Sequence, residues 1–434
     1  MGLANMPGSG HVVEVLTQSA TSTLAKDIGG RETPVTAPAE FEVAVLTGGF
    51  DRPYAFGLVM ALVSKGICLD VIGSDEVDSP GMHTNPSIRF LNLSRRQRRD
   101  ATVVSKASKT LMYYARLLRY AAIAAPKTFH ILWNNKFQLF DRTLLMLYYK
   151  ALGKNVVLTA HNVNQAKRDS NDSLLNRVTL RIQYRLADHI FVHTHKMKSE
   201  LAEDFGVGER AITVLRHPVN NAFPDTDLTP TEAKRRLGIT NDEKTVLFLG
   251  RISPYKGLEH LIDAFHLLAN SDATYRLIIA GELKKGSEKY FDKLQQAISR
   301  DSSRGQILLK LHFIPDKEME LYLKAADALV LPYKEIFQSG VLFLAYSFGL
   351  PVIAADVGSF KEEILEGRTG FVCRPADPVD LAKTIETYFA SDLYRHLEKR
   401  RREIREYANT QHSWDAVGEL TRKVYTDLSR RHRL

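Results

Sequence analysis

Short apolar runs alternate along most of this chain with longer stretches in which apolar residues recur at helical spacing. A short apolar run bounded by turn residues is typical of a buried strand, and helical spacing is typical of a helix packed on one face. In the first half the pattern predicts strands over 41–47, 67–72, 128–133, 155–159 and 189–193, and helices over 54–65, 106–125 and 141–152.

A second series of the same kind begins near residue 245. It predicts strands over 245–249, 275–279, 307–313, 328–331 and 351–354, and helices over 258–268, 289–298 and 317–325. Residues 217–243, which contain several prolines and asparagines, interrupt the alternation and are interpreted as an interdomain connection. Because strands that alternate with helices form parallel sheets, the sequence predicts an α/β protein with two Rossmann-like, doubly wound domains.

The two ends and the cysteines of the chain add to this picture. Residues 1–40 are rich in Gly, Ser, Thr, Ala and Pro without sustained periodicity, which predicts a disordered leader. We find no secretory signal and no apolar run long enough to span a bilayer. The cysteines, Cys68 and Cys373, are too few for a disulfide framework or a metal knuckle, so we expect a cytoplasmic protein.

The net charge of the chain excludes few classes of binding partner. The 59 Lys and Arg against 50 Asp and Glu give a formal net charge of +9, which attracts anionic partners of any kind. Basic residues 95–99 lead into the predicted helix over 106–125, which is cationic and amphipathic. Such a helix suits peripheral binding to an anionic membrane surface, and it equally suits packing on the sheet with solvated cations. No zinc pattern or aromatic-glycine strand signature is present, so no nucleic acid partner is expected.

The segment FLGRISPYKG, from Phe248 to Gly257, carries the strongest candidate chemistry. It closes the first predicted strand of the second half and places Arg251 and Lys256 just before a helix. A loop at a strand end, two cations and exposed helix amides together stabilise the negative charge of a diphosphate. By spacing alone, an ordinary turn with solvated charges is an equally good interpretation.

This segment resembles the phosphate-binding loop of the retaining family-four glycosyltransferases, which have the GT-B fold. Further segments resemble parts of that family in the expected order, namely Gly48–Gly49, Leu158–Asn162, Ala326–Tyr333, Phe348–Ala354 and Glu366–Pro375. The resemblance implies an N-terminal acceptor domain over 41–218 and a C-terminal nucleotide-sugar domain over 219–405. It also implies a last helix, over 406–434, that returns to the N-terminal domain.

The resemblance further implies an activity. A sugar would pass, with retention and without a metal or other cofactor, from a UDP- or GDP-linked donor to a glycan or lipid-linked acceptor in envelope or exopolysaccharide synthesis. Arg251 and Lys256 would take the place of a metal ion beside the departing diphosphate, and Gly49 would approach the donor. An Asp-x-Asp pattern typical of metal-dependent transferases occurs at 225–227, but it lies beside Pro224 and is interpreted as a turn.

One departure from the family concerns two glutamates eight positions apart, whose positions here hold Ile336 and Leu344. Glu335 lies one residue from the first position and is a candidate substitute, with a solvated loop residue as the alternative. The following stretch, Gln338, Ser339, Gly340 and Val341, would contact the donor through backbone amides and a hydroxyl.

His161 follows the predicted strand 155–159 at its carboxyl end, where open parallel sheets bind ligands. Together with the resemblance, this position predicts a catalytic or sugar-positioning role, although a lone histidine is more often structural. Two other functions stay open: a nucleotide-sugar epimerase or hydrolase of the same fold, and a catalytically weakened scaffold that binds nucleotide or glycan. The missing glutamates favour the scaffold, whereas Arg251, Lys256 and His161 together argue against it.

Overall fold

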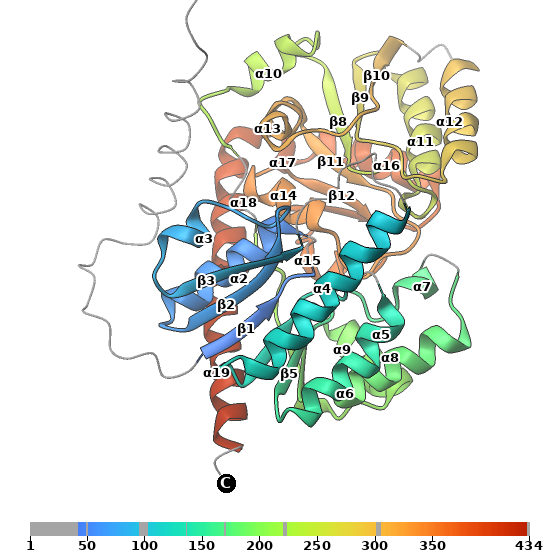
Figure 1. Ribbon diagram of the computed structural model, residues 1–434. Helices are drawn as coiled ribbons and strands as arrows, with labels where there is room; N and C mark the ends of the chain where they lie inside the picture. The colour runs from blue at the N-terminus through green and yellow to red at the C-terminus, as the bar shows by residue number, and fades with distance from the viewer. Residues whose placement is uncertain are drawn as a thin grey trace, which may run out of the picture.

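The structure of the 434-residue chain is a computed structural model, and it describes residues 42–48, 51–94, 103–135, 137–168, 171–219, 224–300 and 305–431. Its two halves each contain one parallel sheet with helices on both faces (Figure 1). The predicted α/β fold with two Rossmann-like domains is therefore confirmed. The predicted disordered leader lies outside the described residues.

The first sheet has seven strands in the order β3-β2-β1-β4-β5-β6-β7. Its strands are β1 (Glu42–Leu46), β2 (Cys68–Ser74), β3 (Ile88–Ser94), β4 (Thr128–Ile131), β5 (Asn155–Thr159), β6 (His189–Val192) and β7 (Ile212–Val214). Its helices are α2 (Arg52–Ser64), α3 (Gly81–Thr84), α4 (Val103–Ile123), α5 (Gln138–Arg142), α6 (Leu144–Ala151), α7 (Gln165–Arg168), α8 (Leu174–Leu186) and α9 (His195–Phe205), with a 3-10 turn at Glu209–Ala211. The strand order reverses between β1 and β4, which is where ligands bind in doubly wound sheets.

The second sheet has six strands in the order β10-β9-β8-β11-β12-β13. Its strands are β8 (Lys244–Leu249), β9 (Tyr275–Ala280), β10 (Ile307–Lys310), β11 (Ala328–Leu331), β12 (Val352–Ala355) and β13 (Gly370–Cys373). Its helices are α10 (Pro230–Arg236), α11 (Leu258–Ser271), α12 (Glu288–Arg300), α13 (Asp316–Ala325), α14 (Gly340–Ser347), α15 (Phe360–Glu363), α16 (Pro378–Ala390), α17 (Asp392–Arg395) and α18 (Leu397–Gln411), with a 3-10 turn at Pro254–Lys256. The order reverses here between β8 and β11.

Several elements were not predicted, or were predicted with different bounds. The predicted helix 141–152 is two helices, α5 and α6, because the backbone of Thr143 leaves the helical region between them. The interdomain connection contains α10, which begins with Thr229 as N-cap and Pro230 in its first turn. The unpredicted strands β3, β7 and β13 lie at sheet edges, where a strand is only partly buried and its apolar pattern is correspondingly weak.

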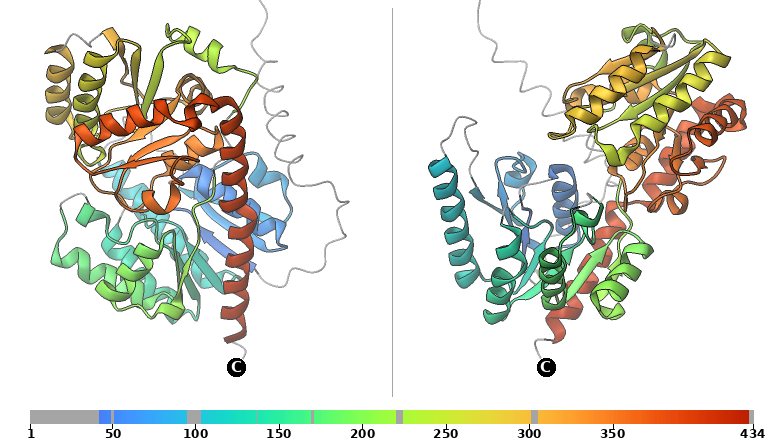
Figure 2. Two further views of the ribbon diagram at one scale, coloured as in Figure 1. Left: turned by 180° about the vertical axis from the view of Figure 1, so that it is seen from behind. Right: turned by 90° about the vertical axis from the view of Figure 1, so that its right-hand side faces the viewer.

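The last helix, α19 (Trp414–Arg431), packs on the first half of the chain (Figure 2). Val417, Tyr425 and Leu428 join the core cluster between α2 and the first sheet. A Cβ atom on Gly57 of α2 would lie 2.1 Å from the Trp414 ring, so only glycine lets the two helices approach this closely.

The chain crosses between the halves twice, at residues 215–219 and 411–414. His412 Nδ1 donates to the carbonyl oxygen of His217 at 3.0 Å, and the Val219 amide donates to the carbonyl oxygen of His412 at 3.0 Å. The His217 ring stacks on Phe343 of α14 with a centroid distance of 4.9 Å. The two crossings therefore form one packed connection that also contacts α14.

Candidate active site

The carboxyl end of β8 brings the predicted phosphate loop against α14. Gly250 has φ +115°, and a Cβ atom there would lie 2.8 Å from Lys256 Nζ and 3.6 Å from Val341 Cγ2. Gly257, with φ +62°, then turns the chain into α11. Lys256 and Val341 are 85 positions apart in the sequence, but the side chains of both lie beside Gly250.

The two cations of the loop have different surroundings. Lys256 is only 6% exposed, and its ammonium group lies 5.1 Å from the centroid of the Tyr333 ring and 5.9 Å from that of Phe248. Arg251 has a side chain that is 63% exposed, and its Nε donates to Glu282 Oε1 at 3.0 Å. Aromatic packing therefore holds Lys256 in one place, whereas Arg251 is a surface cation paired with a carboxylate.

The residues before α14 form the second part of this site. Ser339 is buried at the N-cap of α14 and its side chain makes no capping bond, so the amides of Gly340 and Val341 have no acceptor within the helix, whereas the Leu342 amide donates to the carbonyl oxygen of Ser339 at 3.1 Å. The Ser359 amide donates to the carbonyl oxygen of Phe337 at 3.1 Å, and the Phe337 ring packs on the core of the first half. The loop is thus held from both halves of the molecule.

The positions of the missing glutamates differ in their burial. Glu335 is exposed, and Ile336 and Gln338 are partly buried. Leu344 is 7% exposed and belongs to the core of the second half. An apolar side chain in the core cannot bind a ribose hydroxyl, so any contact to the ribose must come from another residue. The proposed contact between Glu335 and the donor sugar stays a prediction.

His161 lies at the carboxyl end of β5 in an aromatic cage. Its ring stacks on Trp133 at a centroid distance of 4.2 Å and an interplanar angle of 4°, and the Tyr54 ring meets it edge-on at 4.7 Å. Asp51 caps α2 by accepting the Tyr54 amide at 3.1 Å, which fixes Tyr54 in the first turn of that helix. Gly48 (φ +63°) contacts Trp133, whereas Gly49 lies outside the described residues.

Hydrogen bonds determine the tautomer of His161. His193 Nδ1 lies 3.0 Å from the carbonyl oxygen of Leu215, and a carbonyl only accepts, so this nitrogen carries the proton. Burial lowers the pKa of His193 to about 4 and that of His161 well below its usual value, so both rings are neutral near pH 7. His193 Nε2 must then accept from His161 Nδ1, at 3.0 Å. His161 Nε2 is therefore a lone-pair acceptor, and it is buried without a hydrogen-bond partner.

His161 opens onto a pocket of about 360 Å³ at the carboxyl edge of β4 and β5. Asn134 and Gln183 pair through reciprocal amide bonds of 3.2 and 2.7 Å on its wall. None of the described residues that line this pocket is acidic, and one, Arg142, is a cation.

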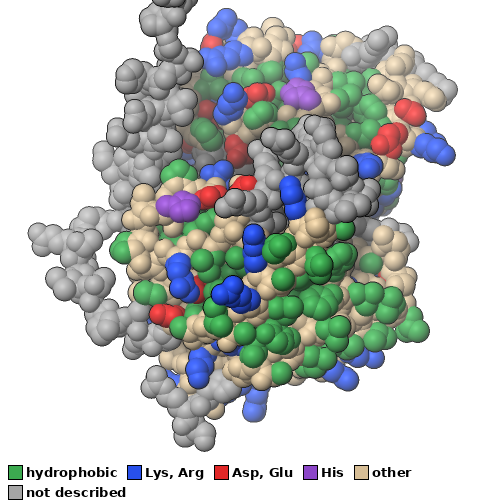
Figure 3. Space-filling model, viewed as in Figure 1, with side chains coloured by type: hydrophobic (Ala, Val, Ile, Leu, Met, Phe, Trp, Pro, Cys, Tyr) green, Lys and Arg blue, Asp and Glu red, His purple; other side chains and the backbone are tan. Residues whose placement is uncertain are grey.

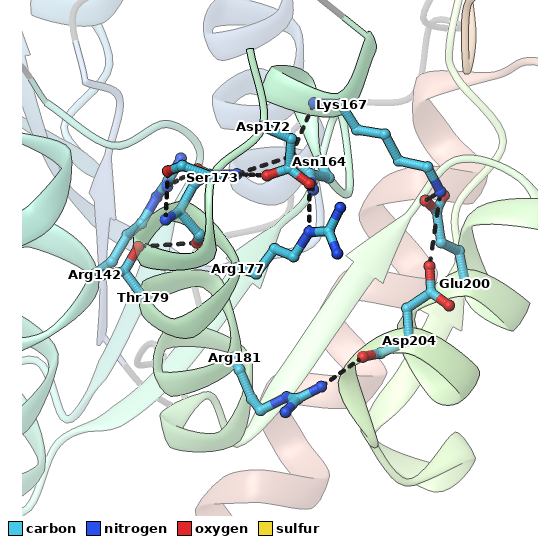
Figure 4. Close-up of polar contacts among 11 residues, drawn as sticks. Arg142, Asn164, Lys167, Asp172, Ser173, Arg177, Thr179, Arg181, Glu200 and Asp204 are labelled. Carbon is cyan, nitrogen blue, oxygen red and sulfur yellow. Dashed lines mark hydrogen bonds and ion pairs between the residues drawn. The ribbon is translucent and has the colours of Figure 1, made fainter. Parts of the chain in front are cut away.

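A polar network holds the wall of this pocket in place (Figure 4). The Asp172 carboxylate accepts from Asn164 at 3.1 Å, from Asn176 at 2.7 Å and from Arg177 at 2.6 Å, and Arg142 Nη1 donates to Asn176 Oδ1 at 2.8 Å. Burial opposes ionisation of Asp172, but the hydrogen bonds from Asn176, Arg177 and Asn164 keep its pKa below the usual value. These side-chain bonds join Asn164, Asp172 and the first turn of α8 to Arg142 of the pocket wall.

The structure joins some predicted site residues and separates others. Arg251, Lys256, Ser339, Gly340 and Val341 lie together on the second half. His161 lies on the first half, and ring contacts through His193 and His217 to Phe343 connect it to α14. Sequence reasoning missed Trp133, His193 and Arg142. A histidine directly after strand 189–192 could have drawn attention to His193, because it ends at the same sheet edge as His161.

The residues of the Asp-x-Asp pattern at 225–227 lie on the surface of the second half and form ion pairs and hydrogen bonds there. Asp225 forms ion pairs with Lys324 and Arg405, each at 2.8 Å, and the Thr226 amide donates to Glu320 at 2.7 Å. These contacts support the interpretation of this segment as part of a turn.

Two parallel-sheet Rossmann-like domains in one chain define a GT-B type of architecture. The model of glycosyl transferases group 1 matches residues 230–411, and that of glycosyltransferase family 4 matches residues 52–223. The chain belongs to the family-four glycosyltransferases.

Individual relatives are similar at lower identity. A D-inositol 3-phosphate glycosyltransferase of Corynebacterium efficiens is 27% identical over 256 residues, which is 55% of this chain and 58% of the relative, so the chain spans less than two thirds of that protein. The solved sucrose-phosphate synthase of Thermosynechococcus elongatus has a TM-score of 0.71 and 18% identity, covering 90% of this chain and 100% of that one. HepE of Anabaena, solved with UDP, has a TM-score of 0.69 and 16% identity, covering 89% and 100%. The last two show a shared fold.

Proposed function

We propose that this protein is a retaining, metal-independent glycosyltransferase that moves a sugar from a UDP- or GDP-linked donor to a hydroxyl group of a glycan or lipid-linked acceptor. We further propose that it acts in envelope or exopolysaccharide synthesis. The observation that carries the proposal is the meeting of Lys256 and Val341 at Gly250, which puts a buried cation beside the amino end of α14. A similar fold in HepE binds UDP, which supports a uridine donor.

In this proposal each half of the site has a separate task. Lys256, Arg251 and the first amides of α14 stabilise the negative charge that grows on the departing diphosphate. The diphosphate takes the acceptor proton on the face it leaves, so no protein nucleophile is required. His161 Nε2 is unprotonated and accepts a hydrogen bond from a sugar hydroxyl, which orients that sugar.

The first expected result is stabilisation by a nucleoside diphosphate. Purified protein is heated with uridine, guanosine or adenosine diphosphate, with no metal and then with excess chelator. A ligand at 100 times its Kd adds about 2.7 kcal/mol to the free energy of unfolding, so one diphosphate should raise the melting temperature regardless of chelator. Arg251→Ala should reduce the shift, whereas the exposed Arg374→Ala should not.

Other results of this measurement would select another function. If no diphosphate raises the melting temperature, the assignment of the phosphate loop is wrong and the glycan-binding scaffold is preferred. If binding requires a metal, the metal-independent mechanism is wrong. If the donor is cleaved or rearranged without any acceptor, the hydrolase or epimerase is preferred.

We also propose that the first half rests on an anionic membrane surface. In the part of the chain that the structure describes, no helix is long and apolar enough to cross a bilayer. Yet 11 of the 16 large apolar side chains described as exposed fall between residues 111 and 178, so they are concentrated on one region. They gather over α4, α5, α6 and α8 (Figure 3), and comprise Leu111, Met112, Ile123, Phe137, Leu139, Leu144, Leu147, Leu152, Leu174, Leu175 and Val178.

The charge of this region matches an anionic lipid surface. Residues 103–187 contain 14 Lys and Arg but only three Asp and no Glu, an excess larger than the +9 of the whole chain. Lys109, Arg116, Arg119, Arg177 and Arg181 are exposed on the same helices as the apolar side chains. Cations near a membrane surface contribute roughly 1 kcal/mol each, and inserted apolar groups add to this.

The second expected result is flotation with anionic vesicles. The protein should float with vesicles that contain phosphatidylglycerol and not with pure phosphatidylcholine. Combined Leu144→Gln, Leu147→Gln and Leu174→Gln should weaken binding about 100-fold, at roughly 1 kcal/mol for each partly inserted leucine. The matched control combines Leu267→Gln, Val379→Gln and Leu420→Gln, which are also exposed but lie elsewhere. Equal losses in both variants would contradict this docking face.

A further inference from the structure

Two buried side-chain atoms of the residues that line the pocket beside His161 have no hydrogen-bond partner. Most of its other polar groups bond to one another or to the backbone: Asn134 pairs with Gln183, Asn135 accepts from Tyr113 at 2.6 Å, and Tyr184 donates to the carbonyl oxygen of Val163 at 2.6 Å. His161 Nε2 and Arg142 Nε are both buried without a hydrogen-bond partner in the structure. One is an acceptor and the other is a charged donor, so the pocket as a whole is complementary to a ligand with a hydroxyl and an anionic group.

Arg142 is unusual because no carboxylate of the described residues lies within ion-pair distance of it, and Asp141 attracts its charge only at longer range. Among the described residues no carboxylate forms an ion pair with its guanidinium group, whose Nη1 bonds to the neutral amide of Asn176. Burial lowers the pKa of Arg142, which shows that its charged form is desolvated. The nearby Asp172 is engaged by Asn164, Asn176 and Arg177, and Asp141 Oδ1 accepts from Tyr114 at 2.9 Å.

A partly buried cation without an ion-pair partner is stabilised when a ligand brings an anion into contact with it. The bond from Nη1 to Asn176 fixes the plane of the guanidinium group, and its Nε is buried without a hydrogen-bond partner in the structure. This edge of an arginine binds two oxygen atoms of a phosphate or a carboxylate side by side. The donor diphosphate is not the natural candidate, because its cations, Lys256 and Arg251, lie on the second half of the molecule.

We infer that the acceptor carries an anionic group, a phosphomonoester or a carboxylate, which Arg142 binds while His161 Nε2 accepts a hydroxyl of the same molecule. The inference rests on the proposed function and narrows its substrate class from any glycan to an anionic one. Both groups line the same pocket of about 360 Å³, which is large enough for one sugar ring with a charged substituent.

The test compares neutral and anionic sugars on the same ring. Titration calorimetry measures binding of glucose, mannose and galactose, each as the free sugar, the 6-phosphate and the uronate, with the donor site saturated by the diphosphate that stabilises the protein. For at least one ring, an anionic form should bind 10- to 100-fold more tightly than the neutral sugar, the range expected for charge-assisted hydrogen bonds. A preference for the phosphate or the uronate tells which anion the acceptor carries.

Variants separate a binding role of Arg142 from a structural one. Arg142→Gln should remove the preference for the anion, and Arg142→Lys should retain part of it because the charge remains. The matched control is Arg210→Gln, an exposed arginine of the 3-10 turn Glu209–Ala211 on the same half of the molecule, which does not line the pocket and should leave the preference unchanged. A preference that survives in Arg142→Gln overturns the inference, as does equal binding of neutral and anionic forms.

Failure of the proposed function would be visible separately. If no diphosphate binds, the glycosyltransferase proposal fails, and the same sugar titrations without diphosphate still test Arg142. If a diphosphate binds and sugar is transferred equally well to neutral and anionic acceptors, only the inference about Arg142 fails.

Discussion

Replacing Lys256 by methionine is expected to lower kcat/KM for sugar transfer by about 100- to 1,000-fold, the usual effect of losing one group that stabilises a developing negative charge. The Lys256 ammonium group lies in a fixed place between the rings of Tyr333 and Phe248, at the end of β8. Methionine is similar in length and packs well against aromatic rings, so the fold should be retained. The measurement is steady-state sugar transfer from nucleotide sugars that carry the nucleoside diphosphate found by the thermal shift.

A second lysine on the same strand provides the control. Lys244 begins β8, where its ammonium group lies 4.8 Å from the centroid of the Tyr275 ring and 2.8 Å from Asp272 Oδ2. Lys244→Met removes a cation with comparable aromatic packing at the opposite end of the strand, and it should leave kcat/KM within about twofold of the unaltered protein. Comparable losses in the two variants would show that Lys256 acts through stability rather than through the diphosphate.

Acidification from pH 6.5 to 5.5 is expected to remove about 4 kcal/mol of the free energy of unfolding. The cause is a set of histidines that burial keeps neutral in the fold. Burial lowers the pKa to about 3 or 4 in five of them and well below the usual value in the sixth; they are His130, His189, His193, His217, His412 and His161. The unfolded chain protonates each near pH 6.5.

The sign follows from the protons that each state binds. Below pH 6.5 the unfolded chain takes up protons that the fold excludes, so the stability present above pH 6.5 is lost as the pH falls toward the folded-state pKa values. Glu363 and Asp141 act in the opposite direction, because burial raises their pKa to about 7 and about 6 and the fold holds their protons. Six histidines against two carboxyl groups leave a net loss of about 4 kcal/mol, compared with a typical total stability of about 5–15 kcal/mol.

Melting temperatures between pH 7.5 and 5.0 test this expectation, with a fall on the order of 10 °C below pH 6.5. His189 bonds to Thr213 at 2.9 Å at the edge of the first sheet. His189→Gln keeps a polar group there but removes one titrating ring, so its melting temperature should depend less steeply on pH. A melting temperature that stays constant down to pH 5 would show that these rings are accessible to protons in the folded state.

Much of the fold could be predicted because local sequence determines it. Strands β5 and β11 were predicted at their observed bounds, since an apolar run that is buried on both faces is unambiguous in the sequence. Edge strands such as β7 were missed because partial burial weakens the apolar pattern. Helix α8 was missed because Leu174, Leu175 and Val178 are exposed, so its apolar residues do not mark a single buried face.

In the candidate site, too, the features within one continuous segment were predicted and the contacts between distant segments were not. The predicted phosphate loop, with Arg251 and Lys256, is a continuous segment, and the sequence alone predicted its place at the end of a strand. The stacking of Trp133 on His161, the bond from His161 to His193 and the burial of Arg142 Nε without a hydrogen-bond partner were not predictable. Each depends on which strands are neighbours and on which atoms remain without a partner. A linear pattern reports how a residue is buried, but only the folded chain determines what that residue touches.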